Sequence, residues 1–344
     1  MNAPDVKVAP PPAKAVTPAV VQTGLHGDAS NLAKVLNAGR FAVCVEVSPP
    51  VGPNVEAIER EIRTLKGYGD AYNVTDNQSA MVHVSSLAVS IMLKQAGMEP
   101  VIQFTARDRN RLGIQGDMLG ASVFGINTLL CLSGDHPIWG DHPQCKPVYD
   151  MDSINLIRMV RMMRDNQVFE NGKTIPKKAP DFFIGAVENP FAPPYDYRPL
   201  RLAKKIVAGA QFIQTQLIFN VDRFREFMKR VVDLGLHEQV AILAGVGPTK
   251  SARVAEYMKN EVAGMDVPDW VIKRMDGLSK EDQQKAGLDM CLEIAHQVME
   301  IEGIKGLHVM AVNWPAAVPQ IVKELGLHPR PVIETATEAA AVSV

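Results

Sequence analysis

The sequence predicts an α/β protein in which eight parallel strands close into a (β/α)8 TIM barrel. Short apolar runs alternate eight times with longer amphipathic stretches, from about residue 41 to about residue 325. Runs that are apolar throughout are typical of parallel strands covered on both faces. Eight strand–helix units in about 300 residues match the size of such a barrel. The competing fold is an open doubly wound sheet, but no Gly-rich GxGxxG turn follows the first strand.

The first unit begins with FAVCVEV (41–47), which Pro49 and Pro50 end abruptly before a helix expected at 55–65. The next three units are AYNVT (71–75) with a helix at 85–97, PVIQFTA (100–106) with a helix at 109–123, and NTLLCLS (127–133) with a helix at 152–165. Each strand is rich in β-branched or other large apolar residues, and each helix is long enough to cross back over the sheet.

The last four units follow the same pattern. They are FFIGAV (182–187) with 198–208, FIQTQLIF (212–219) with 221–234, VAILAGV (240–246) with 251–260, and GLHVMAV (306–312) with 316–325. Additional helices are expected at 268–276 and 281–302, before the eighth strand. One catalytic barrel domain is therefore expected at 29–328, between a flexible Pro/Ala-rich tail at 1–28 and a loose C-terminal tail at 329–344.

Composition excludes several classes of protein. The chain has 36 Lys and Arg against 38 Asp and Glu, and these charges are scattered, which argues against a nucleic-acid-binding or polybasic membrane protein. No apolar run approaches the roughly 20 residues that span a bilayer, and the N-terminus lacks the pattern of a signal peptide. The four cysteines form no CxxC pair, so we expect reduced thiols and a cytoplasmic location.

The first strand carries an unusual carboxylate, Glu46, inside an otherwise apolar run. Burying a carboxylate is costly unless it is paired or its pKa shifts. Glu46 could therefore form a buried salt bridge, for which Arg107 is a candidate, or lie at a solvated strand end. It could also donate a proton in a reaction, and this third possibility fits its position at the carboxyl end of a strand, where barrel enzymes place their chemistry.

Other polar residues gather at the same ends of the expected strands. They are Thr75, Asp76, Asn77, Gln103, Thr105, Ser133, Gly134, Asp135, His136, Glu188, Asn189, Gln216, Asn313 and Trp314. Any one of them could be an ordinary loop or capping residue, and Asp135 alone would more often be structural. Their convergence on one mouth indicates a site for a polar small molecule or cofactor.

Several dispersed motifs identify a family. VEVSPP places a Glu three residues before Pro-Pro, LSGDHP contains a Gly-Asp-x-Pro element, and KKIVAGAQFIQTQLIF joins a Lys, Ala-Gly-Ala and Thr-Gln. VPDWVIKRMDGL and GIKGLHVMAVN follow in the last third. In this order, over about residues 41–327, the sequence resembles the methylenetetrahydrofolate reductases of one-carbon metabolism. The resemblance implies a flavin-dependent (β/α)8 oxidoreductase that interconverts 5,10-methylenetetrahydrofolate and 5-methyltetrahydrofolate by hydride transfer.

The resemblance also assigns roles to residues. Glu46 would be the general acid that protonates N10 of the folate, Asp135 would stabilise the folate cation and tune the flavin, and Gln216 would bind the folate ring. Thr75 would contact the isoalloxazine and Lys205 a flavin phosphate. The full set of expected cofactor-binding residues is Thr75, Gln103, Ser133, Gly134, Asp135, Ala186, Asn189 and Lys205. The family cofactor is FAD, and FMN is an alternative.

Some positions depart from the family pattern. Ser133 stands where an Arg is usual, and Gln103 and Asn189 stand where His is common. The aromatic residues that stack on nicotinamide or folate fall near Ala252 and Met310, although Phe191 or Trp314 could replace them. With these departures, the sequence resembles the branch of the family that is found in anaerobic one-carbon pathways. The electron donor is therefore either NAD(P)H or a partner subunit, and we expect an oligomer or a hetero-complex.

Three further hypotheses compete with parts of this interpretation. His136, His142 and Cys145 have a spacing that can bind zinc, but no fourth ligand is placed and three prolines suit a rigid loop, so we expect no metal. A folate-dependent methyl or methylene transferase without redox chemistry could use the same barrel. A non-catalytic barrel subunit of a redox complex is the third, and the joint presence of Glu46, Asp135 and Gln216 argues against it.

Overall fold

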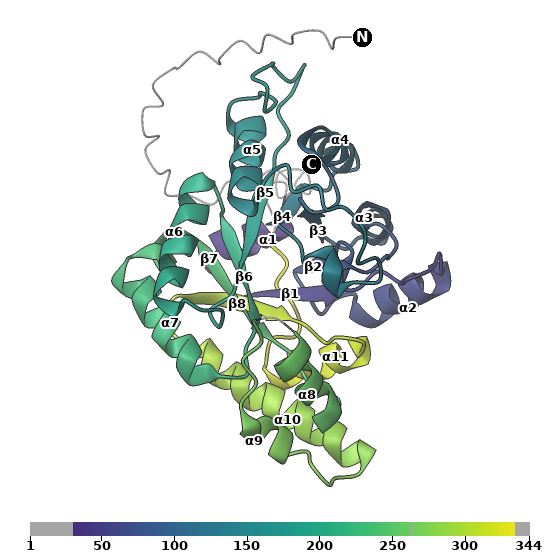
Figure 1. The fold of residues 1–344 in the computed structure, drawn as a ribbon, viewed down its shortest axis with the longest axis vertical. Helices are drawn as coiled ribbons and strands as arrows, with labels where there is room; N and C mark the ends of the chain where they lie inside the picture. The colour runs from purple at the N-terminus through teal and green to yellow at the C-terminus, as the bar shows by residue number, and fades with distance from the viewer. Residues whose placement is uncertain (1–29, 263, 334–344) are drawn as a thin grey trace, which may run out of the picture.

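The computed structural model describes residues 30–262 and 264–333, and their eight strands form a closed parallel barrel in sequence order, as predicted (Figure 1). The strands are β1 Ala42–Val47, β2 Ala71–Val74, β3 Pro100–Thr105, β4 Thr128–Leu132, β5 Phe183–Glu188, β6 Phe212–Leu217, β7 Ala241–Val246 and β8 Ile304–Val309. β1 pairs with both β2 and β8, which closes the barrel. Within the described residues no helix is long and apolar enough to cross a membrane.

Helices surround the barrel on its outside (Figure 1). They are α2 Val55–Leu65, α3 Ser86–Gln95, α4 Arg111–Val123, α5 Ser153–Asp165, α6 Arg198–Ala208, α7 Val221–Asp233, α8 Ala252–Glu261, α9 Asp269–Lys273, α10 Lys280–Met299 and α11 Val318–Glu324. Most begin at a capping residue whose side chain accepts a backbone N–H, such as Asn54, Ser85, Asn110 and Asp152. The expected additional helices before the eighth strand are α9 and α10.

A short helix that was not predicted from the sequence, α1 (Asn31–Asn37), comes before β1 and packs against the barrel. Its buried residues Leu32, Val35 and Leu36 join the inner cluster that also contains Phe183 and Phe212. These two rings stack with their centroids 5.0 Å apart. Because α1 packs on the interior residues near the amino ends of the strands, it leaves only the carboxyl ends open.

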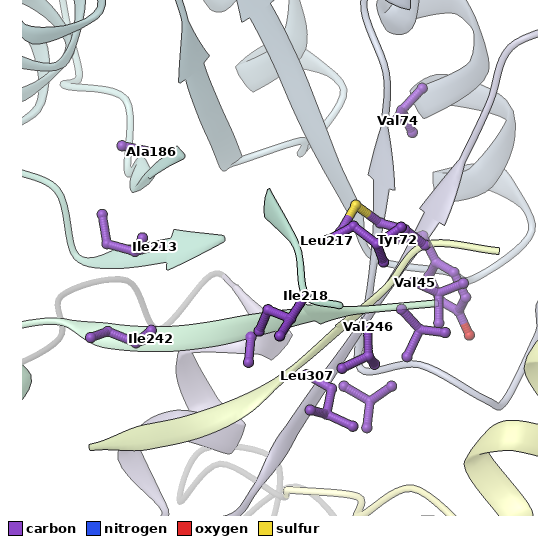
Figure 2. Packing of buried hydrophobic residues seen from close by; sticks show 14 of the residues in the cluster. Val45, Tyr72, Val74, Ala186, Ile213, Leu217, Ile218, Ile242, Val246 and Leu307 are labelled. Atoms are coloured by element: carbon purple, nitrogen blue, oxygen red, sulfur yellow. The ribbon is translucent and has the colours of Figure 1, made fainter. Parts of the chain in front are cut away.

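The strands sort their side chains into an outer and an inner set, since successive residues point to opposite faces. The outer set, shown in part in Figure 2, includes Val45, Val74, Ile213 and Leu307, which pack in the same cluster as the helices. The inner set changes along the barrel axis. Near the carboxyl ends its partly exposed members are Glu46, Gln103, Leu132, Val187 and Gln216. This ring of five inward positions, which we call the mouth, defines where a ligand can enter.

The chain beyond residue 328 is more firmly held than the sequence analysis expected. Arg330 donates hydrogen bonds to the buried carboxylate of Asp70, at 2.7 and 3.0 Å, and to the carbonyl of Phe41, at 2.6 Å. Arg330 is thus bonded to the barrel, within the segment expected to be a loose tail from residue 329. The expected tail residues 1–28 and 334–344 lie outside the described residues.

Candidate active site

Glu46 points into the mouth from β1, and its side chain is 17% exposed. Its nearest basic group is His308, whose Nε2 lies 3.8 Å from Glu46 Oε2. Burial lowers the pKa of His308 to about 3, so this imidazole is neutral and offers no compensating charge. Desolvation, and secondarily the charge of Glu61, raises the pKa of Glu46 to about 7. Glu46 is therefore a carboxyl group that can hold a proton near neutral pH.

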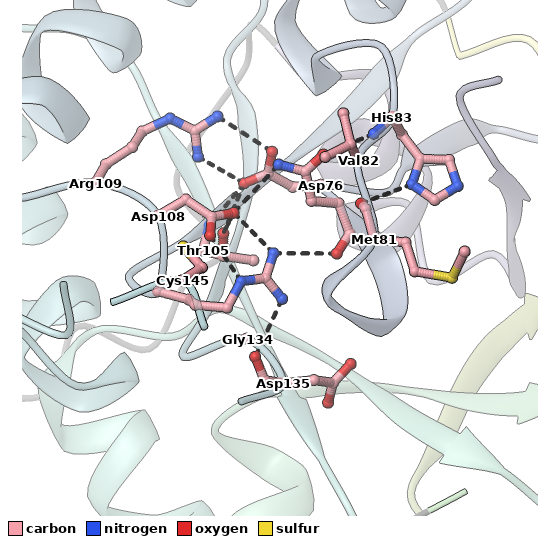
Figure 3. Close-up of polar contacts among 12 residues, drawn as sticks. Asp76, Met81, Val82, His83, Thr105, Asp108, Arg109, Gly134, Asp135 and Cys145 are labelled. Atoms are coloured by element: carbon pink, nitrogen blue, oxygen red, sulfur yellow. Dashed lines mark hydrogen bonds and ion pairs between the residues drawn. The ribbon is translucent and has the colours of Figure 1, made fainter. Parts of the chain in front are cut away.

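The salt bridge between Glu46 and Arg107, one of the alternatives for this residue, does not form. Arg107 instead pairs with Asp108 through two hydrogen bonds of 2.7 Å. Its remaining donors bind the carbonyl oxygens of Asn77, at 3.0 Å, and Asp135, at 3.2 Å. With all its groups engaged, Arg107 fixes the backbone of the loop that carries Asp135 (Figure 3).

Sequence reasoning missed Glu61, the second carboxyl group beside Glu46. It lies on α2, its carboxylate accepts the backbone N–H of Ser48, and burial raises its pKa to about 7. Ile58 and Leu65 are buried on the same helix, three residues before and four residues after it. A glutamate on the apolar face of an amphipathic helix is a signal that could have found it.

Asp135 is exposed in the loop that follows β4. Gly134, directly before it, has φ +86°, and a Cβ there would lie 3.1 Å from Arg107 Cβ and 3.2 Å from Thr105 Cβ. A residue with a side chain would be strained at this position and crowded against β3. The bond from Arg107 to the Asp135 carbonyl fixes the backbone, while the exposed carboxylate remains available.

A buried charge cluster supports the neighbouring loop. Asp76 is 2% exposed and accepts two hydrogen bonds from Arg109, at 2.7 and 3.1 Å (Figure 3). It also accepts the backbone N–H of Thr105 at 3.0 Å and its hydroxyl at 2.9 Å. These bonds tie the end of β2 to the end of β3, and Gln103 adds another by accepting the N–H of Asp76 at 3.3 Å.

Thr75 is buried, whereas Gln216 is partly exposed. Thr75 is 4% exposed, and its hydroxyl donates to Gln78 Oε1 at 2.8 Å. Gln216 is partly exposed in the mouth, where its Oε1 accepts the N–H of Leu217 at 2.9 Å. Its Nε2 has no partner among residues 30–262 and 264–333, which leaves a donor for a ligand.

Three of the expected cofactor residues have protein partners of their own. Lys205, only 3% exposed, donates to the carboxylate of Glu188 at 2.7 Å and to the carbonyl of Val187. Its contact with a flavin phosphate stays a prediction, since Glu188 already neutralises the ammonium group. Ser133 accepts the N–H of Ser153 at 3.2 Å, and Asn189 accepts the N–H of Phe191 at 2.9 Å.

The side chain of Ala186 lies on the outer face of β5. It is fully buried and belongs to the outer set, which packs against the helices (Figure 2). The inward positions of β5 are those on either side of it in sequence, Gly185 and Val187, because side chains alternate along a strand. The Ala186 side chain therefore does not reach the mouth, where β5 contributes Val187, and a contact between Ala186 and the cofactor stays a prediction.

Beyond the ends of β7 and β8, Ala252 and Met310 stand near the positions where the resemblance implies aromatic residues. Met310 is 9% exposed and lies so close to β7 that a Cβ on Gly245 would be 2.6 Å from its Cε. Of the two possible replacements, Phe191 is 4% exposed and Trp314 is partly exposed with Lys250 Nζ 5.9 Å from its ring centroid.

The loop with His136, His142 and Cys145 does not gather them around one point. Nδ1 of His136 accepts the N–H of Ile138, and His142 pairs with Asp141 at 2.8 Å. In the part of the chain that the structure describes, no three His, Cys, Asp or Glu side chains are grouped so as to hold a metal ion.

A family model and several similar sequences indicate one family. A family model described as "Methylenetetrahydrofolate reductase" matches residues 31–326. The chain is 23% identical over 259 residues to a probable methylenetetrahydrofolate reductase (NADPH) of Caenorhabditis elegans, covering 73% of this chain and 36% of that protein. It is 24% identical over 302 residues to a 5,10-methylenetetrahydrofolate reductase of Pectobacterium carotovorum, covering 85% of this chain and 92% of that protein.

The lengths of these relatives differ. The chain spans little more than a third of the nematode protein and of a Schizosaccharomyces pombe relative, methylenetetrahydrofolate reductase 2, of which 38% is covered. Among solved structures, an uncharacterized protein from Clostridium thermocellum that binds two copies of 5-methyl-5,6,7,8-tetrahydrofolic acid has a TM-score of 0.62 at 16% identity. The match covers 86% of this chain and 98% of that one, and it supports the barrel fold.

Proposed function

The chain belongs to the methylenetetrahydrofolate reductase family, and we propose that it interconverts 5,10-methylenetetrahydrofolate and 5-methyltetrahydrofolate through a bound flavin. The Pectobacterium relative, nearly all of which is covered, carries that activity in its name. The Clostridium neighbour binds a methylated folate, which is the product expected in the reducing direction. Both similarities point to the folate as the substrate class.

The single observation that carries the proposal is the environment of Glu46. Opening the methylene bridge of the folate requires protonation of N10, and this demands an acid that is still protonated near neutral pH. Glu46 has a pKa of about 7, faces the mouth and has no cationic partner among the described residues. A carboxyl group of this kind resembles other buried acids that donate protons in enzymes.

The residues around the mouth fit a flavin. When bound, the flavin supplies the hydride. Asp135 presents an exposed charge on a fixed backbone, while the amides of Gln103 and Gln216 offer hydrogen-bonding groups and Leu132 and Val187 offer apolar contact. In this proposal Asp135 stabilises the positive charge that develops on the folate, Gln216 orients its ring, and Thr75 supports the isoalloxazine site through Gln78.

The electron donor is either NAD(P)H or a partner subunit within a hetero-complex. Met310 and the start of α8 at Ala252 provide no aromatic surface at the positions where family members stack nicotinamide. Stacking contributes about 0.5–1.5 kcal/mol beyond buried area. Its loss weakens a nicotinamide more than a folate, which has further contacts, and therefore favours the partner subunit.

Identification of the cofactor tests this proposal. We expect the purified chain to be yellow, and mass spectrometry of the released cofactor to give FAD or FMN. A colourless chain that binds neither flavin at micromolar concentration would contradict the reductase and favour a non-redox folate-dependent transferase. A non-catalytic barrel subunit would bind flavin, but its flavin would not exchange electrons with the folate.

A further inference from the structure

A layer of polar side chains fills the barrel interior directly below Glu46. It consists of Cys44, Asn73, Gln214 and His308, each at most 4% exposed. In the parallel register Glu46 lies opposite Asn73, and Cys44 lies opposite His308. Several inward residues deeper in the barrel, such as Phe183, Phe212 and Leu243, are apolar. Polar groups in such a place cost free energy unless they are bonded to one another or serve a purpose.

Hydrogen bonds satisfy this layer only in part. Gln214 Nε2 lies 3.2 Å from Cys44 Sγ, and Asn73 Nδ2 lies 3.5 Å from His308 Nε2. Seven buried side-chain N or O atoms of the described residues have no partner, and three of them are here: Asn73 Oδ1, Gln214 Oε1 and His308 Nδ1. Each such atom has given up its hydrogen bonds to water without gaining one in the protein, which lowers stability. Their concentration under Glu46 is unlike a core selected for stability alone.

The neutral imidazole of His308 has one nitrogen that donates and one that accepts. Nδ2 of Asn73 lies 3.5 Å from Nε2 and can only donate, so this contact requires the tautomer with the ring proton on Nδ1 and the lone pair on Nε2. The same Nε2 lies 3.8 Å from Glu46 Oε2. Its single lone pair accepts from one donor at a time, either from Asn73 or, after a small approach, from the O–H of a protonated Glu46, and it repels a carboxylate.

We propose that His308 is a positioning residue that favours the protonated form of Glu46 from below, because the one lone pair of Nε2 accepts the O–H of Glu46 in place of Asn73 Nδ2 and repels the carboxylate. Glu61 on α2 acts in the same direction, because a second negative charge disfavours ionisation of Glu46. Cys44, on the same strand as Glu46, is held in its neutral thiol form by burial, which raises its pKa. Of the described groups facing Glu46 from β1, β2, β8 and α2, none is cationic. The consequence for catalysis rests on the proposed function, in which Glu46 donates a proton to N10 of the folate.

The imidazole tautomer tests this inference without any reaction. Nitrogen-15 NMR of the parent chain, with His308 assigned by comparison with His308→Gln, reports which ring nitrogen carries the proton. We expect a neutral ring with the proton on Nδ1, and an Nε2 signal that shifts as Glu46 ionises, with a midpoint at about pH 7. In Glu46→Gln that shift should disappear. A proton on Nε2 below this midpoint, or the same shift in Glu46→Gln, would overturn the proposal.

A pair of variants supplies the functional readout. His308→Gln offers an amide donor to Glu46, so the midpoint of the pH profile of folate reduction should move to lower pH, with a rate loss of about two- to tenfold for one hydrogen bond. His237→Gln is the matched control, because His237 also lies 4.0 Å from a glutamate, Glu302, and has a buried Nδ1 without a partner. Its pH profile should equal the parent's.

An unchanged midpoint in His308→Gln would refute the positioning role. If the chain reduces no folate at all, the proposed function fails, and the NMR result still decides whether His308 accepts from Glu46. If His308→Gln does not fold, the Nε2 response in the parent and in Glu46→Gln decides alone. The two failures are therefore distinguishable.

Discussion

Replacing Glu46 by glutamine is expected to slow reduction of 5,10-methylenetetrahydrofolate by about 10²–10⁴-fold, the usual contribution of a general acid. Glutamine keeps the shape of the side chain but cannot release a proton to N10. Binding and reduction of the flavin should be nearly unchanged, because neither step uses this proton. Stopped-flow absorbance separates the two half-reactions, so the loss should be confined to the half-reaction with folate.

The pH dependence gives this prediction its sign. The raised pKa of Glu46, about 7, means that the acid form predominates below that pH and is lost above it. The rate constant of the parent should therefore be level at low pH and fall as pH rises through this value. The rate constant of Glu46→Gln should not show this fall. Glu59→Gln is the matched control, since Glu59 is an exposed glutamate on α2 paired with Arg63. A Glu46→Gln rate equal to that of the control would make Glu46 a structural carboxyl group.

Asp76→Ala should destabilise the fold by about 3–5 kcal/mol, the usual cost of removing one partner of a buried ion pair. The substitution removes the carboxylate that accepts two hydrogen bonds from Arg109. It also leaves the backbone N–H of Thr105 without an acceptor. Denaturant unfolding followed by circular dichroism measures the change in the free energy of unfolding.

Asp117→Ala is the control for this substitution. Asp117 also pairs with Arg109, at 2.9 Å, but its side chain is 43% exposed. Exposed pairs contribute about 0–1 kcal/mol, so this variant should unfold nearly as the parent does. Equal losses in the two variants would show that Asp76 does not hold the ends of β2 and β3 together.

The strands could be predicted well from the sequence because a parallel strand that is buried on both faces is a continuous run of apolar residues. Glu46 was recognisable for the same reason, since it is the one charged residue within the predicted apolar runs. α1 escaped prediction because seven residues are too few to show a helical period beside a strand. The outward orientation of the Ala186 side chain could not be predicted, because a motif match fixes the position of a residue along the chain but does not reveal which face of the strand it occupies.

Interactions between distant elements were beyond the reach of the sequence. Lys205 and Glu188 were both placed near the site, yet nothing in the chain revealed that they neutralise each other. Arg107 was considered a partner for Glu46, and the competing carboxylate of Asp108 engages it instead. His308 lies more than 200 residues from Glu46 along the chain and becomes its neighbour only because β8 closes the barrel against β1.

In the proposed reaction this barrel passes a hydride between a flavin and a folate. The decisive experiment mixes the pre-reduced flavoprotein with 5,10-methylenetetrahydrofolate in the absence of oxygen. We predict that the flavin absorbance returns in a single turnover and that an equal amount of 5-methyltetrahydrofolate appears. A flavin that stays reduced while the folate remains unchanged would contradict the account.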